Sequence, residues 1–337
     1  MIISCDFGHS SIKATNGEKE IIFPSILSED VKTVNPNDLL DNFDPVDYMR
    51  VKFERGEYFV GNLAKKQSRL CMFSHNDEDA LSEQTKLLIY TAAAYLMEDS
   101  ADKTVKLVTT LPVSHSSLRE EFKDMLYSPK HSISMSIYDY KKDRYNSNIF
   151  FIDKLEVRSQ GLFALMNEIL DATGRIKQDK KQLAAGYNVV TDIGFYSTDI
   201  YITRALEHIN FTTDKPLPGM SEVYHMLSNK ITEQFGVRKR LYELEDNVIS
   251  KHIKINGKAY GLSKYLQSMC RSLANNLIAN IYNLVPNVKE VDNVILTGGG
   301  SIPLQKHFKK EFENVKVLDD PRMSNCRGGM KWAKRKW

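Results

Sequence analysis

Two short turns in this sequence have residue types that suit the binding of a phosphate group. Each has the form Asp-x-Gly, with Asp6 and Gly8 near the start of the chain and Asp192 and Gly194 in its second half. Because glycine has no Cβ, the backbone can approach a phosphate closely and offer it an N–H donor. An aspartate can hold a hydrated Mg²⁺, which combines one or two carboxylates with waters and phosphate oxygens. We therefore expect Asp6 and Asp192 to bind Mg²⁺ through water.

The two turns belong to a longer repeated pattern. Residues 3–11 and residues 189–197 align at a constant offset of 186 residues, and the Asp, the Gly and the last Ser coincide. An apolar segment precedes each turn and another follows it, which predicts a strand–turn–strand unit in each copy. One such turn alone is often an ordinary surface turn. Two copies favour two similar domains that each present a phosphate-binding turn.

Polar groups beside the turns extend the predicted phosphate sites. The hydroxyls of Ser10, Ser11, Ser197 and Thr198 add hydrogen-bond donors, and the ammonium group of Lys13 adds positive charge near the β- and γ-phosphates. These side chains complement the backbone N–H groups of the turns. We expect all five residues to contact a bound nucleotide.

A glycine run in the second half of the chain is a third candidate for nucleotide binding. Gly298, Gly299, Gly300 and Ser301 stand between an apolar segment at 294–296 and a predicted helix. The glycines allow close approach of a nucleotide, and the N-terminus of a helix attracts phosphates through its dipole and its N–H groups. The spacing matches neither a Walker GxxxxGK[ST] loop nor a Rossmann GxGxxG loop. The run is therefore a candidate nucleotide site of neither the Walker type nor the Rossmann type.

The segments that must position these candidates alternate between strand and helix. Apolar spacing predicts strands at 2–5, 105–109 and 294–296, and helices at 82–98, near 160, at 220–235, at 261–284 and from about residue 323. Ser117 begins a sequence with the form of a capping box, which predicts the start of another helix. A β-rich stretch spans 132–157, whereas the polar stretch 28–48 has the composition of an insertion. The alternation is typical of an α/β fold.

Composition indicates a soluble globular protein of two domains. The chain has 337 residues, of which 42% are hydrophobic and 26% are charged, and chains of this length usually divide into two domains. The 46 basic and 43 acidic residues leave a net charge of only +3, so no strong field argues for direct DNA binding. The apolar runs are shorter than the roughly 20 residues of a membrane helix, and the N-terminus does not have the form of a signal peptide. We expect a cytoplasmic protein without a membrane anchor.

The cysteine and histidine patterns point away from a disulfide framework and from a structural metal site. The eight histidines show no HExxH spacing, and no CxxC pair occurs among Cys5, Cys71, Cys270 and Cys326. We expect free thiols, buried where they lie in apolar runs.

Four segments, taken in order, resemble the nucleotide-binding motifs of the superfamily of actins, heat-shock chaperones and sugar kinases. They are similar to its phosphate 1, connect 1, phosphate 2 and adenosine motifs, and they are Asp6-x-Gly8, Gln160-Gly161, Asp192-x-Gly194 and Gly298–Gly300. Within the superfamily, three further segments resemble the bacterial actins that segregate plasmids, the ParM or StbA type: FPS at 23–25, YFVGNLA at 58–64 and TTLPV at 109–113. The resemblance covers nearly the whole chain.

The resemblance implies an actin-like ATPase fold of the α/β class, with two duplicated α/β domains flanking a nucleotide cleft. Domain I would comprise residues 1–158, with a small inserted subdomain at about 30–75, and the C-terminal helix 321–337 would complete it. Domain II would comprise residues 159–320, with a small subdomain at about 205–285. The implied ligands are Mg²⁺ and ATP or ADP, with GTP as an open alternative.

The resemblance also implies roles for single residues. Gln160 falls where actins place the glutamine that orients the attacking water, and an amide acts there by positioning because it is not a strong base. Asp192 would polarise this water or hold Mg²⁺. Asn229 and Lys230 would approach the adenosine from the helix that follows Pro218. The alternatives are an ordinary helix start at Gln160 and a solvated helix face at Asn229 and Lys230.

The implied function is that of a filament whose monomers add with ATP bound, hydrolyse it after assembly and leave an unstable ADP filament. Its implied partners are further copies of the chain and a small DNA-binding adaptor of the ParR type at a plasmid centromere. A sugar-type small-molecule kinase is the main alternative. That reaction needs a carboxylate base beside the acceptor hydroxyl, and the sequence offers no candidate motif for such a base. A chaperone-like ATPase would need a substrate-binding domain after residue 337, and a membrane-division actin would need a membrane-targeting tail.

The last seven residues, 331–337, mix lysine, arginine and tryptophan. Such a segment either contacts nucleic acid or an anionic surface, or forms an amphipathic end whose tryptophans pack while its lysines are solvated. The sequence leaves both interpretations open.

Overall fold

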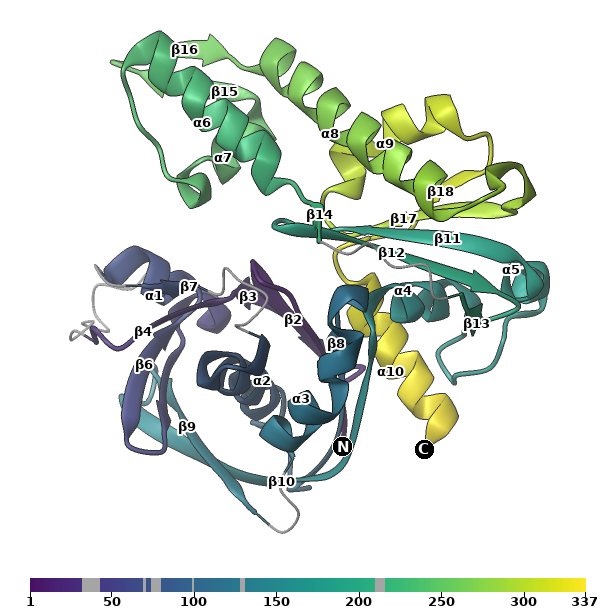
Figure 1. Cartoon of the computed structure of the whole chain (residues 1–337). Helices are drawn as coiled ribbons and strands as arrows, with labels where there is room; N and C mark the ends of the chain where they lie inside the picture. The colour runs from purple at the N-terminus through teal and green to yellow at the C-terminus, as the bar shows by residue number, and fades with distance from the viewer. Residues whose placement is uncertain (32–42, 69–70, 74–79, 99, 128–130, 210–215) are drawn as a thin grey trace. The chain divides into compact units, whose positions relative to one another are not determined.

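The computed structural model describes residues 1–31, 43–68, 71–73, 80–98, 100–127, 131–209 and 216–337. Within these residues the chain divides into two compact units (Figure 1). The first unit comprises Met1–Gln178 together with Met323–Trp337, and the second comprises Asp179–Arg322. Part of the insertion expected at about 30–75, including residues 32–42, lies outside the described residues.

A ten-stranded sheet forms the framework of the first unit. In spatial order its strands are β3 (Glu20–Pro24), β2 (Ser11–Thr15), β1 (Ile2–Phe7), β8 (Thr104–Leu111), β10 (Arg144–Ser159), β9 (Ile133–Asp139), β5 (Arg50–Phe53), β6 (Gly56–Val60), β4 (Ile26–Ser28) and β7 (Met72–Phe73). Strand β10 joins the two halves of the sheet because its 16 residues pair first antiparallel with β9 and then parallel with β8. The strands of the expected insertion that the structure describes are β5, β6 and β7. They therefore belong to the same sheet as β1 and β2, which flank the first Asp-x-Gly turn.

Helices cover both sides of the central strands of the first unit. They are α1 (Asn62–Gln67), α2 (Glu83–Leu96), α3 (Arg119–Leu126), α4 (Gln160–Ile169) and α10 (Ser324–Lys336), with short 3-10 segments η2 (Pro45–Tyr48) and η4 (Val113–Leu118). The sheet curves around α2, which contacts β1, β2 and β9 in the main hydrophobic core (Figure 1). Helices α4 and α10 pack against each other, and α10 also covers β1 and β8. This packing carries the first unit to Gln178, past the boundary expected at residue 158.

The second unit contains a six-stranded sheet and a two-stranded ribbon. The sheet has the order β13 (Glu207–His208), β12 (Ser197–Arg204), β11 (Tyr187–Ile193), β17 (Asn293–Thr297) and β18 (Val315–Val317), with β14 (Leu217–Pro218) also paired to β12, and the ribbon joins β15 (His252–Ile255) to β16 (Lys258–Gly261). The helices are α5 (Lys181–Ala185), α6 (Ser221–Phe235), α7 (Glu245–Ser250), α8 (Ser263–Leu284) and α9 (Ser301–Glu311), with η5 (Gln178–Lys180), η6 (Leu241–Glu243) and η7 (Val288–Glu290). One hydrophobic core joins α6, α8 and α9 to β11 and β17. The region expected as a small subdomain at about 205–285 therefore shares its core with the sheet.

The two sheets repeat one arrangement of four strands. In the first unit β1 is antiparallel to β2 and parallel to β8, which is itself parallel to β10. In the second unit β11 is antiparallel to β12 and parallel to β17, which is itself parallel to β18. The strand–turn–strand repeat predicted from residues 3–11 and 189–197 is confirmed.

Most of the predicted elements are present. Helices α2, α4, α6 and α8 lie where apolar spacing predicts them, and the alternation of strands and helices confirms the α/β class. The capping box predicted at Ser117 is wrong, because a 3-10 segment occupies Val113–Leu118 and α3 begins at Arg119 without a side-chain cap. In the part of the chain that the structure describes, no helix combines the length and apolar character needed to cross a membrane. The free thiols are those of Cys5, Cys71, Cys270 and Cys326.

The basic C-terminal segment is the end of α10 and is engaged within the first unit. The ring of Trp332 lies 5.8 Å from the ring of Phe163, centroid to centroid. Lys331 Nζ donates a hydrogen bond of 2.7 Å to the carbonyl oxygen of Asn167. Of the two interpretations, these contacts favour an amphipathic helix end that packs on its own unit.

Candidate functional site

The first Asp-x-Gly turn connects β1 to β2 and is fixed by its own backbone. The Gly8 N–H donates a hydrogen bond of 3.2 Å to the Ser11 carbonyl oxygen. A Cβ at Gly8 would lie 3.0 Å from that oxygen and from Lys13 Nζ, so glycine is what lets the lysine side chain reach the turn. Ser25 closes the other side, where its Oγ donates to the Gly8 carbonyl oxygen at 2.5 Å and its N–H donates to the Ser10 carbonyl oxygen at 3.1 Å. The predicted residues Gly8, Ser10, Ser11 and Lys13 thus lie together.

We call Asp6, Gly8, Ser10, Ser11 and Lys13 the first half-site. Asp6 lies at its centre and is buried, with 2% of its surface exposed. Its Oδ1 accepts hydrogen bonds from Thr110 Oγ1 at 2.7 Å and from Gln160 Nε2 at 3.3 Å. Its Oδ2 accepts one from Lys13 Nζ at 3.3 Å, because Lys13 is the cross-strand neighbour of Asp6 in the β1–β2 pair. Three donors satisfy a carboxylate that burial would otherwise penalise. Oδ2, with a single donor, can still accept a further hydrogen bond.

Gln160 is the first residue of α4 and reaches the same point. Its Nε2 donates to Asp6 Oδ1 and, at 3.2 Å, to the carbonyl oxygen of Phe7. Both amide protons are therefore engaged, which leaves Oε1 as the atom able to accept a hydrogen bond from a water. A neutral amide in this position can orient a water, but it is too weak a base to remove its proton.

The second turn, between β11 and β12, repeats the first. The Gly194 N–H donates to the Ser197 carbonyl oxygen at 2.9 Å, the same bond that Gly8 makes to Ser11. The segment that leads into α6 holds this turn from outside, because the Met220 N–H donates to the Gly194 carbonyl oxygen at 3.1 Å. The start of α6 therefore abuts the second turn.

The glycine run packs directly against the second turn. Gly298 has a φ of +77°, and a Cβ there would lie only 2.4 Å from Asp192 Oδ1. The Gly300 N–H donates to the carbonyl oxygen of Ile193 at 2.9 Å. Both positions require glycine, one for its backbone conformation and both for the close approach. The structure therefore brings the glycine run and the second Asp-x-Gly turn together within one unit.

Asp192 stands directly opposite Asp199 in the antiparallel pair of β11 and β12. Directly opposed residues of two antiparallel strands share one face of the sheet, with Cβ atoms about 4.5–5.5 Å apart. Both residues are largely buried, at 7% and 8% exposure. Two carboxylates that share one face attract a cation, so the pair fits a hydrated Mg²⁺. Among the residues that the structure describes, no group of three or more His, Cys, Asp or Glu side chains is arranged to hold a metal.

Two of the predicted hydroxyl donors are already engaged. Thr198 Oγ1 donates to the Pro218 carbonyl oxygen at 2.8 Å, and Ser301 Oγ donates to the Gly298 carbonyl oxygen at 2.7 Å. Both residues are buried. Their hydroxyl protons therefore hold the second turn and the glycine run in shape rather than facing a ligand.

Asn229 and Lys230 lie farther along α6 than the other predicted residues of the second unit. They stand eight and nine residues after Ser221, which places them about 12 Å along the helix from its start. Asn229 is exposed, and Lys230 Nζ lies 3.1 Å from a carboxylate oxygen of Glu233. The structure does not bring these two residues to the loops that meet at the start of α6.

Three residues of the two half-sites are absent from the sequence predictions. Thr110 donates to Asp6, Asp199 opposes Asp192, and Arg322 lies beside Gly299, where an added Cβ would be 3.5 Å from Arg322 Nε. A signal for Asp199 was present, since it occupies the position of the second copy that corresponds to Lys13 of the first.

Two family models match the sequence. The model of the N-terminal domain of actin-like proteins matches residues 4–162, and the model of the C-terminal domain of the archaeal, MreB-like actin homologue matches residues 190–310. Together these ranges contain both Asp-x-Gly turns and the glycine run. No curated protein matches the sequence significantly.

Solved structures of actin-like proteins share the fold over nearly the whole chain. A 15-stranded ParM filament from Clostridium botulinum matches with a TM-score of 0.82 and 23% identity, and covers 100% of this chain and 99% of that one. A non-polymerisable quadruple mutant of pCBH ParM matches with a TM-score of 0.80 and 24% identity over 99% of both chains. The archaeal actin homologue Ta0583, in complex with ADP, matches with a TM-score of 0.76 and 20% identity over 99% of both chains. At these identities the likeness shows the fold.

Proposed function

The chain is an actin-like protein, and we propose that it binds and hydrolyses ATP with Mg²⁺, assembles into filaments as it does so, and segregates plasmid DNA through a DNA-binding adaptor. The observation that carries the proposal is the pair of turns after β1 and β11. In both, a glycine N–H closes the turn onto a serine carbonyl oxygen, and a buried aspartate precedes the glycine. Two such turns in one chain favour a ligand with several phosphate groups.

In the first unit, the proposal assigns phosphate binding to the residues that follow Gly8. Because the Gly8 N–H is used to close the turn, the donors for a phosphate are the N–H and hydroxyl groups of Ser10 and Ser11. Lys13 Nζ, held 3.3 Å from Asp6, supplies positive charge at the same place. The first turn thus presents an ammonium group whose position is fixed by its ion pair with Asp6.

In the second unit, the proposal assigns Mg²⁺ to Asp192 and Asp199; in the first unit, it keeps the expectation that Asp6 binds Mg²⁺ through water. When bound, Mg²⁺ neutralises negative charge on the phosphate oxygens. The N–H and hydroxyl of Ser197 would contact phosphate, and the glycines at 298–300 would allow the nucleotide to come close to Asp192. The ADP complex of Ta0583, which shares this fold, supports a nucleotide as the ligand.

Hydrolysis, rather than transfer to an acceptor hydroxyl, is supported by the groups around Gln160. The Oε1 of Gln160 can orient a water. The nearby carboxylate of Asp6 is already engaged by three protein donors, one of them an ammonium group. This arrangement suits an ATPase better than a small-molecule kinase.

Filament assembly is supported by the fold, because one of the similar structures is a ParM filament and another is a ParM variant described as non-polymerisable. The plasmid role adds a partner, a small DNA-binding adaptor of the ParR type at a plasmid centromere. ATP is the proposed substrate, with GTP as the competing nucleotide.

Light scattering and sedimentation with and without nucleotide test the proposal. The purified chain with Mg²⁺ and ATP should scatter light and pellet, and the scattering should fall as phosphate is released. Parallel samples with GTP and with a slowly hydrolysed ATP analogue determine the nucleotide preference and whether hydrolysis ends the filament. A chain that stays monomeric with every nucleotide, yet phosphorylates a small acceptor, would be a kinase and would contradict the proposal.

A further inference from the structure

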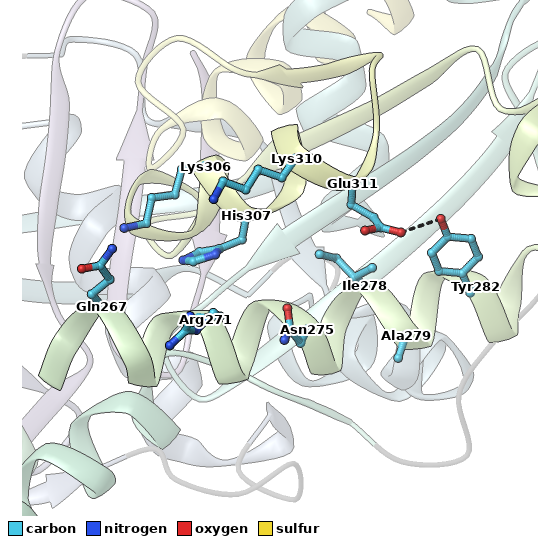
Figure 2. Close-up of a pocket in the computed structure, with 10 residues that line it drawn as sticks. All are labelled: Gln267, Arg271, Asn275, Ile278, Ala279, Tyr282, Lys306, His307, Lys310 and Glu311. Carbon is cyan, nitrogen blue, oxygen red and sulfur yellow. Dashed lines mark hydrogen bonds between the residues drawn. The ribbon is translucent and has the colours of Figure 1, made fainter. Parts of the chain in front are cut away.

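A groove of ≈ 480 Å³ runs between α8 and α9 in the second unit. Its lining is mostly polar and basic, and the ten residues are Gln267, Arg271, Asn275, Ile278, Ala279, Tyr282, Lys306, His307, Lys310 and Glu311. Figure 2 shows the basic residues toward one end of the groove and a tyrosine–glutamate hydrogen bond at the other. None of these residues belongs to the Asp-x-Gly turns or the glycine run. The volume is in the range of sites for small organic ligands, about 300–1,000 Å³.

The basic end of the groove concentrates unneutralised positive charge. Arg271 from α8 and Lys306 and Lys310 from α9 line the groove, and none of them forms an ion pair with a residue that the structure describes. Two lysines on other helices are paired by contrast, Lys123 to Glu120 and Lys230 to Glu233. Since the whole chain has nearly equal numbers of basic and acidic residues, this accumulation is a local feature and does not follow from composition.

His307 lies among these three cations. Its Nε2 is buried and has no hydrogen-bond partner in the structure. Burial lowers the pKa of His307, and the charges of Lys306, Lys310 and Arg271 lower it further. A buried polar nitrogen without a partner is costly unless something binds it. An anion in the groove would supply that partner and would offset the mutual repulsion of the three cations.

The other end of the groove is suited to an uncharged group. Ile278 and Ala279 contribute apolar surface, and the ring of Tyr282 adds an aromatic face. The acidic lining residue, Glu311, accepts a hydrogen bond from Tyr282 Oη at 2.8 Å, and this bond holds it at the far end. An anionic ligand that enters at the basic end therefore meets apolar atoms next.

We propose that this groove binds a small organic phosphate, with the phosphate at Arg271, Lys306, His307 and Lys310 and the organic part over Ile278 and Ala279. Phosphate fits better than a single carboxylate because it offers three oxygens to a guanidinium fork, two ammonium groups and an imidazole N–H. The site is separate from the proposed nucleotide half-sites and does not depend on filament assembly.

NMR of His307 in the full-length chain tests the proposal, with phenyl phosphate as the probe. The imidazole signal, assigned by its loss in His307→Asn, is titrated with pH with and without the probe. A phosphate beside the ring stabilises the imidazolium form, so the pKa of His307 should rise when the probe is bound. Phosphate bound at the Asp-x-Gly turns would lie outside the groove, so a rise in this pKa that is lost in Lys306→Ala with Lys310→Ala reports binding in the groove itself.

Matched variants separate a built site from general attraction to a basic helix. Lys306→Ala with Lys310→Ala should weaken phenyl phosphate binding by about tenfold or more, because two charge-assisted contacts are lost. Lys309→Ala, on the same helix but outside the groove, where its Nζ bonds to Gln305 Oε1 at 3.1 Å, should leave the affinity unchanged. Equal losses in the two variants would overturn the proposal.

Two further ligands test the chemical class. Inorganic phosphate should bind more weakly than phenyl phosphate, because it leaves the apolar end empty, and benzoate should bind more weakly still. Equal binding of benzoate would contradict the assignment to phosphate, and equal binding of inorganic phosphate would contradict the organic part. An unchanged pKa of His307 at millimolar phenyl phosphate, in a chain that circular dichroism shows to be folded, would overturn the site itself.

Discussion

Nε2 of Gln160 donates a hydrogen bond of 3.3 Å to Oδ1 of Asp6, so the first residue of α4 is tied to the aspartate near the end of β1. The two residues are 154 positions apart in the sequence. Thr110, at the end of β8, donates to the same oxygen at 2.7 Å. The proposed water-positioning residue and the proposed phosphate turn therefore share one hydrogen-bond network, and a displacement of α4 would reach both.

Gln160→Ala should bind ATP but hydrolyse it slowly. The residue is assigned to the attacking water and not to the phosphates, so affinity should change little. Losing a positioned water should slow hydrolysis by roughly tenfold to a thousandfold, on the order of 1.4–4 kcal/mol of barrier. If hydrolysis destabilises the filament, filaments of the variant should outlast those of the wild type. Phosphate release and light scattering, recorded in one sample, measure both quantities.

Gln182→Ala, at an exposed position of α5, is the control for this experiment and should behave as the wild type does. Normal phosphate release in Gln160→Ala would remove the residue from the mechanism. Slow release combined with unchanged disassembly would keep its role but contradict the link between hydrolysis and filament lifetime.

Asp192→Ala and Asp199→Ala should both reduce Mg²⁺-dependent turnover. Asp192→Ala should nearly abolish phosphate release, because a carboxylate that holds the ion or the water lowers the activation barrier of hydrolysis by several kcal/mol. Asp199→Ala should increase the Mg²⁺ concentration needed for half-maximal rate, since the two carboxylates share one face of the β11–β12 pair. Phosphate release is measured against Mg²⁺ concentration, with the exposed Asp246→Ala as control. Wild-type Mg²⁺ dependence in Asp199→Ala would restrict the proposed ion site to Asp192.

Much of the fold follows from local patterns in the sequence. The helix at 261–284 was predictable because its apolar residues recur every three or four positions, and α8 spans Ser263–Leu284. The strand–turn–strand units were predictable because the same short pattern occurs twice. The capping box at Ser117 failed because the chain forms a 3-10 segment there first, so the helix begins after the predicted cap.

The missing parts of the site depend on contacts between distant segments. Thr110 reaches Asp6 only because β1 and β8 are parallel with Cys5 opposite Thr109, and no local pattern determines this register. Asp199 is a different case, since its position is fixed by the repeat. The alignment of the copies marks position 199 through Lys13, but because the two residues have opposite charge it does not indicate a carboxylate there.

Glu20→Gln should make the first unit less stable above about pH 4.5 and should reduce its acid sensitivity. Arg327 of α10 donates two hydrogen bonds of 2.7 Å to Glu20, and this hydrogen bonding and charge hold the pKa of Glu20 below its ordinary value of 4.5. A lowered pKa in the folded state stabilises the protein above the unfolded value, and this contribution is lost as the pH falls through the folded pKa. Because the pair is partly exposed, the effect should be at most about 1 kcal/mol.

Urea unfolding at a series of pH values from neutral to acid measures this effect. The difference in unfolding free energy between wild type and Glu20→Gln should shrink as the pH falls. Glu121→Gln, an exposed position on α3, is the control. A difference that stays constant with pH would show that the ion pair of Glu20 and Arg327 does not contribute through its charge.

Gly328→Ala should loosen α10 from α4 and impair hydrolysis at a distance. A Cβ at Gly328 would lie 1.7 Å from the carbonyl oxygen of Phe163, a backbone atom that cannot move aside without shifting α4. Overpacking of this kind costs typically 1–3 kcal/mol or more. Because α4 begins at Gln160, its displacement should also move the amide away from Asp6. Urea unfolding and phosphate release together measure the two consequences.

Gly261→Ala is the matched control for Gly328→Ala, because a Cβ there would meet no heavy atom within 4 Å. It should change the unfolding free energy by less than about 0.5 kcal/mol, as surface substitutions usually do, and leave phosphate release unchanged. If the Gly328 variant is destabilised but still releases phosphate at the wild-type rate when folded and saturated with ATP, α4 does not transmit its position to the catalytic water. If its stability is also unchanged, the close crossing of α4 and α10 would be contradicted. Slow release in a chain that is folded at the assay temperature would instead show that Gly328 keeps Gln160 in place through the backbone of α4.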